Sequence, residues 1–491
     1  MSAAHTPTQQ AEQECFLCFL DPHPPCATQQ LEGRIITAHE RILNGEKTPI
    51  IILDTGTARV EVHFIQNYYG KFIKELYERG TTIHNLALRL YHLPSPPVIT
   101  EYKQQPRHIY QTNSYTLAVL EPDTLLNITD LNHAEYCVRQ YLLHALVPST
   151  PSPATIRGNL VHHCFKELLK EHDRGELMNG HVAKGQETPL ATLQRHFEQA
   201  LHQNSLELAL ANVSVEAMRA EVAPHLESLA TWYQNQSATL WDMPTASSDM
   251  QAATPDVQRN ENMVRAETFL LAPEIGLRGR LDLLWQQNNR QSLLELKTGG
   301  SGNLPKSTHR WQVYGYHALL AVRRDPRMKK ARGTLLYSGT PGEAQAFGIE
   351  PTIRDIQRVN ETRNILVLSH LTGIPSAPPG PSRCTRCAML SECEQVSSLL
   401  NWQPPEPAVD TPPQNGHMPS SEISAETPAA ILRHTYSDEE KTFFARYYNL
   451  LRLEGREGEQ QQALLWKTSV AERIEGGSAI GDLVPLGQPE P

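Results

Sequence analysis

Residues 282–297 read DLLWQQNNRQSLLELK, and this stretch decides how the central part of the chain folds. An Asn-Asn pair stands at 288–289 and favours a two-residue hairpin turn, because Asn tolerates positive φ. Pairing the chain outward from that turn sets Asp282 opposite Glu295, with Cβ atoms roughly 5 Å apart. Lys297 projects from the same face. Because two facing carboxylates repel each other unless a cation lies between them, the stretch predicts a divalent-metal site on a β-hairpin. The alternative is a surface hairpin that happens to carry these side chains.

The polar side chains of this hairpin suit the hydrolysis of a phosphodiester. That reaction requires a neutralised phosphate charge and a water molecule that is nucleophilic near neutral pH, and divalent ions held by carboxylates supply both. We assign Asp282 and Glu295 as ligands of Mg²⁺ or Mn²⁺, with the Leu296 carbonyl as a third ligand. Lys297 would orient the attacking water or stabilise the charge that develops on the phosphate.

Two segments with helical patterns carry further candidates. The segment GNLVHHCF (158–165) contains His162, which could complete the metal coordination, and the adjacent His163 is the alternative. Gln312 and Tyr316 are four residues apart and therefore share one helix face. There they contact the substrate, buttress the lysine of the hairpin, or take part in ordinary helix packing.

Composition describes a globular chain without a membrane anchor. The 491 residues have a net charge of −10, a hydrophobic fraction of 39% and a mean hydropathy of −0.44. No apolar run approaches the roughly 20 residues that span a bilayer, and the N-terminus lacks a signal pattern. We therefore expect a cytoplasmic, DNA-associated protein.

Basic residues concentrate around the hairpin. Residues 276–333 contain twelve Lys or Arg against three Asp or Glu, although the whole chain is acidic. Such a stretch is either a solvated face or a groove that attracts a polyanion. The candidate DNA contacts are Arg278, Arg280, Lys306 and Arg310.

Cysteines form two clusters that indicate metal ligation rather than disulfides. Downstream of the hairpin, Cys384, Cys387 and Cys393 have the spacing C-x₂-C-x₅-C, and Cys137 is the best fourth ligand. Near the N-terminus, Cys15, Cys18, His23 and Cys26 could bind a structural zinc ion, with unligated thiols as the alternative.

The pattern along the chain changes from β to α and back. Residues 32–120 contain strand-like segments at 50–54, 58–65, 81–93 and 114–120, which favour a small OB-like β-barrel. Helical patterns follow at 134–147, 156–171, 190–235 and 310–324, with a loop expected at 243–260. Residues 397–430 have the composition of a disordered linker. A capping box at Ser437-x-x-Glu440 opens another helix, and 464–485 resembles the start of a β-rich unit.

The order His162, Asp282, Glu295-x-Lys297, Gln312-x-x-x-Tyr316 resembles the RecB-type branch of the PD-(D/E)xK nucleases. Cys137 upstream and the three cysteines downstream are similar to the iron–sulfur members of that branch. These include the AddB nuclease, the CRISPR-adaptation exonuclease and the nuclease domain of the Dna-two helicase/nucleases. The resemblance implies an α/β restriction-endonuclease-like core, stapled by a 4Fe–4S cluster on the four cysteines. Zinc on the same thiolates is the alternative.

Flanking sequence is most similar to the DNA-replication helicase/nucleases of the Dna-two type, over residues 32–396 and 431–485. The resemblance implies cleavage of single-stranded DNA, such as flaps and resected ends. The expected domains are a Cys/Pro-rich segment (1–31), an OB-like barrel (32–120), an iron–sulfur nuclease (121–396), a linker (397–430), and a helical stalk with an incomplete β-rich unit (431–491).

The sequence departs from the resemblance in the ATP-binding part of the helicase. A helicase of this family needs a Walker A loop, G-x-x-x-x-G-K-[ST], and the sequence contains none. We expect a metal-dependent deoxyribonuclease that works with a separately encoded helicase, on a chain that is split or truncated. The alternatives are a stand-alone RecB-like exonuclease of repair or CRISPR adaptation, and a non-catalytic DNA-binding or helicase-scaffolding subunit.

Overall fold

A computed structural model describes residues 29–65, 69–94, 97–102, 105–147, 152–173, 187–241, 263–287, 290–300, 302–323, 329–340, 342–405 and 435–481. The chain divides into two compact units. Unit 1 comprises residues 1–122, 126–132 and 148–363, and unit 2 comprises residues 123–125, 133–147 and 364–491. The predicted N-terminal zinc site and the whole of the predicted loop at 243–260 lie outside the described residues.

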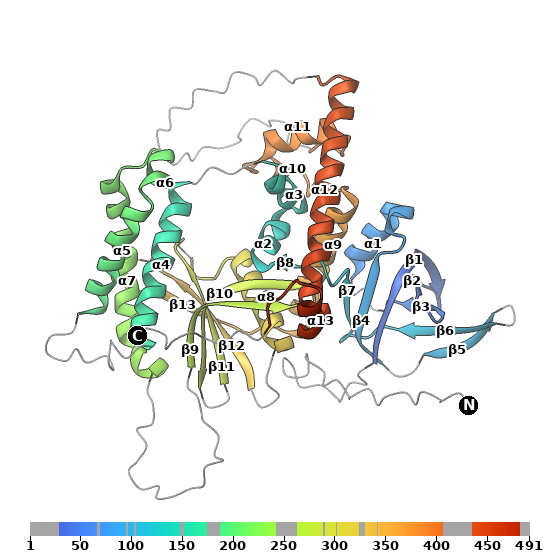
Figure 1. Cartoon of the computed structure of the whole chain (residues 1–491), viewed down its shortest axis with the longest axis horizontal. Coiled ribbons are helices and arrows are strands. Elements are labelled where there is room, and N and C mark those ends of the chain that lie inside the picture. Colours follow the sequence, from blue (N-terminus) through green and yellow to red (C-terminus); the bar gives the residue numbers. More distant parts are fainter. Residues whose placement is uncertain are drawn as a thin grey trace, which may run out of the picture. The chain divides into compact units, whose positions relative to one another are not determined.

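The first sheet of unit 1 contains seven strands in the order β5-β6-β3-β2-β1-β4-β7 (Figure 1). All neighbours are antiparallel except β3 and β6. Asn44 and Gly45 both have positive φ, which suits the tight turn that joins β1 to β2. The strands are β1 (Gln29–Leu43), β2 (Glu46–Asp54), β3 (Arg59–His63), β4 (Ala87–Leu93), β5 (Val98–Tyr102), β6 (Gln105–Gln111) and β7 (Leu117–Leu120).

The predicted OB-like barrel needs correction in one respect. Strands form within all four segments that were expected to be extended, but no pairing joins β5 to β7 in the described residues, so the sheet is open there. Helix α1 (Gly70–Arg79) and a 3₁₀ turn (Gly80–Ile83) lie between β3 and β4. The start of the predicted 81–93 strand is therefore a turn, and the strand begins at Ala87.

The second sheet of unit 1 holds the hairpin. Its order is β13-β12-β11-β10-β8, and β9 also pairs with β10. The β10–β11 ladder runs from Leu283↔Leu294 to Gln287↔Arg290, which is the register expected from the sequence. The turn residues 288–289 are outside the described part of the chain. The strands are β8 (Leu126–Asn127), β9 (Met263–Ala272), β10 (Leu277–Gln287), β11 (Arg290–Lys297), β12 (Lys329–Tyr337) and β13 (Gln345–Ile349).

Helices of unit 1 form its apolar core against this sheet. Leu283, Leu294, Leu296 and Leu336 of the sheet are buried in one cluster with residues of α4, α5, α6 and α7. Leucines alternate with Glu295 and Lys297 along β11, so the polar pair is directed away from that cluster. The helices are α4 (Pro153–Asp173), α5 (Pro189–Gln203), α6 (Ser205–Leu210), α7 (Val215–Trp241), α8 (Ser307–Arg323) and α9 (Ile353–Thr372), the last continuing into unit 2.

Unit 2 is helical. Its core contains Leu142, Leu143, Cys393, Val396 and Trp402. The helices are α2 (Ile128–Tyr136), which begins in unit 1, α3 (Val138–Leu146), α10 (Pro381–Cys384), α11 (Leu390–Leu400), α12 (Asp438–Lys467) and α13 (Val470–Glu475). No helix in the described part of the chain is long and apolar enough to cross a membrane.

Three expectations for unit 2 differ from the structure. The helix expected at 134–147 is broken at Cys137, which has extended backbone angles. Residues 397–400, placed in the linker, are the last turn of α11, and Trp402 beyond them is buried because its ring packs into the core. The capping box at Ser437 opens α12 as expected, but the segment after it forms α13 behind a second capping box at Ser469, and no strand occurs over 435–481.

Candidate active site

Asp282 lies at the centre of the polar group on the hairpin. Its Oδ2 accepts a hydrogen bond from the Leu296 amide at 2.7 Å, and its Oδ1 lies 3.1 Å from Nδ1 of His162. Burial alone would raise the pKa of Asp282, but His162, Lys297 and the amide together hold that pKa below its usual value. The strand ladder thus brings Leu296 to Asp282, and α4 brings His162, which is 120 residues away in the sequence.

Glu295 is the most enclosed member of the group, with 3% of its surface exposed. Its Oε1 accepts from Lys297 Nζ at 2.7 Å and from Gln312 Nε2 at 2.5 Å. Its Oε2 is buried and has no hydrogen-bond partner among the residues that the structure describes. Burial, followed by the charge of Asp282, raises the pKa of Glu295 to about 7. An unpartnered buried carboxylate oxygen is costly, so this atom requires a cation or a proton.

His162 responds to the same electrostatic environment. Burial opposes its protonation, yet the Asp282 carboxylate holds the pKa of His162 above its usual value. The Asp282 carboxylate contributes to both raised pKa values, because its negative charge opposes ionisation of Glu295 and favours protonation of His162. A hard divalent ion would neutralise that charge, and these three side chains offer the oxygen and imidazole donors that such ions accept. The residues therefore fit the expected metal.

Helix α8 supplies the support for Lys297. Gln312 Oε1 accepts from Lys297 Nζ at 2.7 Å and from Asn132 Nδ2 at 3.2 Å. The Tyr316 hydroxyl donates to the Arg280 carbonyl at 2.5 Å and lies 3.4 Å from Gln312 Nε2. Of the alternatives left open by the sequence, the contacts favour buttressing of the lysine. Both side chains are buried.

His163 and Cys164, which follow His162 on α4, lie away from the group. The His163 ring is 6.5 Å from that of His196 on α5, and Cys164 is fully buried in the apolar core. The structure thus separates the two histidines that the sequence left as alternatives. Leu296 contributes its amide to Asp282, and the metal-ligand role of its carbonyl stays a prediction.

The four predicted DNA contacts fall into two classes. Arg278 is held by Asn127 at 3.0 Å, and the exposed Arg280 lies 3.6 Å from Glu267. Lys306 and Arg310 are exposed, and neither forms an ion pair with the residues that the structure describes. The second pair is therefore better placed to contact a phosphate backbone.

Several polar residues that support the site were not singled out in the sequence. The Lys297 carbonyl accepts from the Ser338 amide at 2.9 Å, and Ser338 Oγ lies 3.0 Å from Nδ1 of the buried His225 on α7. Asn132 on α2 contacts Gln312, as described above. The sequence around these residues does not indicate any of the three contacts, because each contact joins segments more than 40 residues apart.

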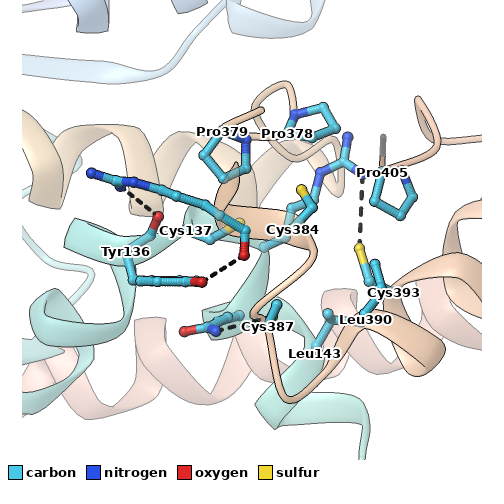
Figure 2. A pocket seen from close by; sticks show the side chains of 13 residues that line it. Tyr136, Cys137, Leu143, Pro378, Pro379, Cys384, Cys387, Leu390, Cys393 and Pro405 are labelled. Atoms are coloured by element: carbon cyan, nitrogen blue, oxygen red, sulfur yellow. Dashed lines mark hydrogen bonds between the residues drawn. The ribbon is translucent and has the colours of Figure 1, made fainter. Parts of the chain in front are cut away.

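The four cysteines of the predicted cluster line one pocket of unit 2 (Figure 2). Gln140 Nε2 donates to Cys387 Sγ at 3.3 Å. Burial raises the pKa of Cys137. Over the described residues, no set of three or more His, Cys, Asp or Glu side chains is positioned to hold a metal ion as it stands. The cluster and its zinc alternative therefore both stay predictions.

The surroundings of Arg139 indicate whether the pocket suits a metal bound by thiolates. The residue is 2% exposed, and its guanidinium donates to the Ser376 and Gln403 carbonyls and lies 4.0 Å from Cys393 Sγ. No carboxylate of the described residues pairs with it, and none lines the pocket. A buried cation without an anionic partner is costly. Because a metal held by four thiolates carries negative charge, it would supply that partner, so the pocket fits a thiolate-bound metal.

Comparisons with known proteins agree with this geometry. Residues 70–287 match the family model for DNA replication factor Dna2, which is the Dna-two family expected from the sequence. This part of the chain is similar to a Dna2-type nuclease domain. Two relatives of that type are the DNA replication ATP-dependent helicase/nucleases DNA2 of Xenopus tropicalis, 23% identical over 406 residues, and of Xenopus laevis, 22% identical over 391 residues. Each alignment covers 75% of this chain and 35% of the relative, so the chain spans about a third of their length.

Among solved structures, one titled "Crystal structure of SSO0001" aligns with 47% of this chain and 94% of its own, at 18% identity. The TM-score of that alignment is 0.21, which is too low to bear on the fold of the Dna2-type domain. The match to the Dna2 family includes His162 and Asp282 and ends before Glu295 and Lys297. Those two residues are assigned to the site by the hairpin geometry alone.

Proposed function

We propose that the protein is a metal-dependent deoxyribonuclease that cleaves single-stranded DNA during replication or repair. The observation that carries the proposal is the buried, unpartnered Oε2 of Glu295 beside Asp282, with Lys297 on the opposite oxygen of the same carboxylate. A non-catalytic DNA-binding or scaffolding subunit would have no physical reason to keep such an arrangement, because an unpartnered buried oxygen destabilises the fold.

The residues of the site have two roles, metal binding and the placement of a fixed positive charge. Asp282, Glu295 and His162 would hold Mg²⁺ or Mn²⁺, and the Leu296 carbonyl is a further candidate ligand. Such an ion lowers the pKa of bound water and neutralises phosphate charge. Lys297 Nζ, held between Glu295 and Gln312, places a fixed positive charge beside the carboxylates, where it can orient water or stabilise the transition state.

Two further parts of the proposal concern the rest of the chain. The four cysteines of unit 2 would hold a 4Fe–4S cluster, with Arg139 as the neighbouring cation. The relatives are named as ATP-dependent helicase/nucleases, whereas this sequence contains no Walker A loop. We propose that a helicase delivers single-stranded DNA to the site.

Anaerobic purification with metal analysis, followed by cleavage of single-stranded oligonucleotides with blocked 5′ or 3′ ends, tests the function. We expect Mg²⁺- or Mn²⁺-dependent cleavage and no ATP requirement. Cleavage that is lost whenever one particular end is blocked would indicate a stand-alone exonuclease instead. DNA binding without any cleavage under every metal condition would leave the scaffolding alternative and reject the nuclease.

Two substitutions test the assignment of the site. Asp282→Ala and Lys297→Ala should each lower the cleavage rate by on the order of 100-fold or more, because each removes a charge that acts at the reacting phosphate. DNA binding should persist, since the surrounding basic residues remain. His163→Ala, on the same helix turn but directed toward α5, is the matched control and should cleave normally. Normal cleavage by both active-site variants would reject the assignment.

A further inference from the structure

A polar cluster beside the carboxylates has no part in the proposed metal site. Tyr337 is the ladder partner of Lys297 on β12, and its side chain is fully buried. Its hydroxyl accepts a hydrogen bond from the Lys306 amide at 3.2 Å and lies 2.8 Å from Nδ1 of His309. Tyr337 thereby fixes both the start of α8 and the orientation of one imidazole.

The hydrogen-bond network assigns the tautomer of that imidazole. The Tyr337 hydroxyl has one proton to donate, and within the described residues His309 Nδ1 is the acceptor available to it. If Nδ1 carried the ring proton, the hydroxyl hydrogen would be buried without an acceptor, at about 1–3 kcal/mol. Nδ1 therefore accepts from Tyr337, and the proton lies on Nε2.

The His309 ring lies close enough to two lysine side chains for their charges to act on it. Nε2 has no hydrogen-bond partner among the described residues, and the ring is only partly buried. Burial, followed by the charges of Lys297 and Lys306, lowers the pKa of His309 to about 4. The imidazole is thus a neutral donor near two ammonium groups, one turn before Gln312 on α8. N–H donors grouped in this way suit an oxygen-rich anion.

We propose that His309 binds a phosphate oxygen of the DNA strand through Nε2, at the backbone next to the carboxylate pair, while Lys306 contributes charge at the same place. This inference rests on the proposed nuclease function and adds a substrate-binding residue to it. Because His309 is neutral, its contact adds affinity without releasing a counterion. Lys306 adds affinity that depends on salt.

The test measures binding of a single-stranded oligonucleotide to the full chain at several NaCl concentrations, in the Asp282→Ala background so that the DNA stays intact. His309→Phe, which keeps ring volume and removes the donor, should weaken binding on the order of tenfold without changing the slope of log K against log salt. Lys306→Met should make that slope less negative by about 0.7. His309→Gln, which can place an N–H near the position of Nε2, should recover most of the affinity.

Tyr337→Phe supplies a second, independent measurement. Without the hydroxyl the ring proton can also occupy Nδ1, so binding should weaken modestly, and the loss in the double variant with His309→Phe should be smaller than the sum of the two single losses. Unchanged affinity in His309→Phe, or a salt slope that changes as in Lys306→Met, would overturn the proposal. So would additive losses in the double variant. If His309→Phe does not fold, His309→Gln and Tyr337→Phe decide the question by the same criteria.

Failure of this inference is separable from failure of the nuclease. DNA binding that depends on His309, in a protein that never cleaves, would support the contact and reject the nuclease. Cleavage by the otherwise unchanged protein together with unaltered DNA binding in His309→Phe would keep the nuclease and reject the contact.

Discussion

At the residue scale, the site depends on one carboxylate whose two oxygens have different surroundings. Glu295 Oε1 accepts two hydrogen bonds, whereas Oε2 is buried with none. Asp282 differs, because both of its oxygens have partners and its pKa is lowered rather than raised. Paired carboxylates whose environments separate their pKa values are typical of sites that bind cations or transfer protons.

Replacing this carboxylate by its amide separates function from stability. Glu295→Gln should abolish metal-dependent cleavage and leave the melting temperature of the metal-free protein unchanged or higher, because the amide is uncharged and can be buried at lower cost. Thermal unfolding in a chelator, beside a cleavage assay, checks both. Glu227→Gln, at an exposed position of α7, is the control and should alter neither quantity. A large fall in the melting temperature would mean that Glu295 stabilises the fold without a metal.

At the element scale, α8 joins the strands of the second sheet to Lys297, the lysine proposed to act in catalysis. His309, Gln312 and Tyr316 are spaced three and four residues apart, so they lie on one face of the helix. Each contacts a different strand or side chain: Tyr337, Lys297 and the Arg280 carbonyl. The helix therefore sets the position of Lys297 relative to both β10 and β12.

Removing one of these contacts should weaken catalysis modestly. Tyr316→Phe loses a hydroxyl that donates to Arg280, a neutral hydrogen bond that contributes about 1 kcal/mol. We expect kcat to fall by roughly fivefold with little change in KM, because the lysine is less well positioned while substrate contacts remain. Tyr314→Phe, on another face of α8, is the control. A change confined to KM would instead place Tyr316 in the substrate-binding surface.

At the scale of the whole molecule, the chain places its two sets of candidate metal ligands in different units. The carboxylate site belongs to unit 1, and the four cysteines line a pocket of unit 2. Cys137 precedes strands β9–β13 in the sequence and the other three cysteines follow them, so a shared metal would tie segments almost 250 residues apart. Such a cross-link stabilises mainly by restricting the unfolded chain.

Replacing one of these cysteines should therefore lower the stability of unit 2 more than that of unit 1. Cys384→Ser should remove the visible absorbance of an iron–sulfur cluster and speed hydrogen exchange in α3 and α11, while β10 and β11 keep most of their protection. Cys164→Ser, in the apolar core of unit 1, is the control and should leave the absorbance intact. A colourless wild type that carries stoichiometric zinc would reject the cluster in favour of zinc.

Much of the site could be predicted from the sequence, because the patterns that specify it lie within short segments of the chain. The hairpin register follows from two strand patterns and a two-residue turn, so the facing of Asp282 and Glu295 could be predicted from a stretch of sixteen residues. Helix positions followed from apolar periodicity, and the start of α12 followed from its capping box. Spacing of the cysteines likewise grouped Cys384, Cys387 and Cys393, and the family resemblance added Cys137, which lines the same pocket.

Tertiary structure alone decided what has no local signal. The choice of His162 over His163, the contact of Asn132 with Gln312, and the pairing of His309 with Tyr337 depend on how distant elements pack. The open first sheet, and α13 in place of strands, also depend on pairing partners that period and composition do not specify. The sequence by itself determined which chemistry the hairpin carries. Packing determined which side chains surround it, because burial, charge and hydrogen bonding are set by neighbours that are close in space and remote along the chain.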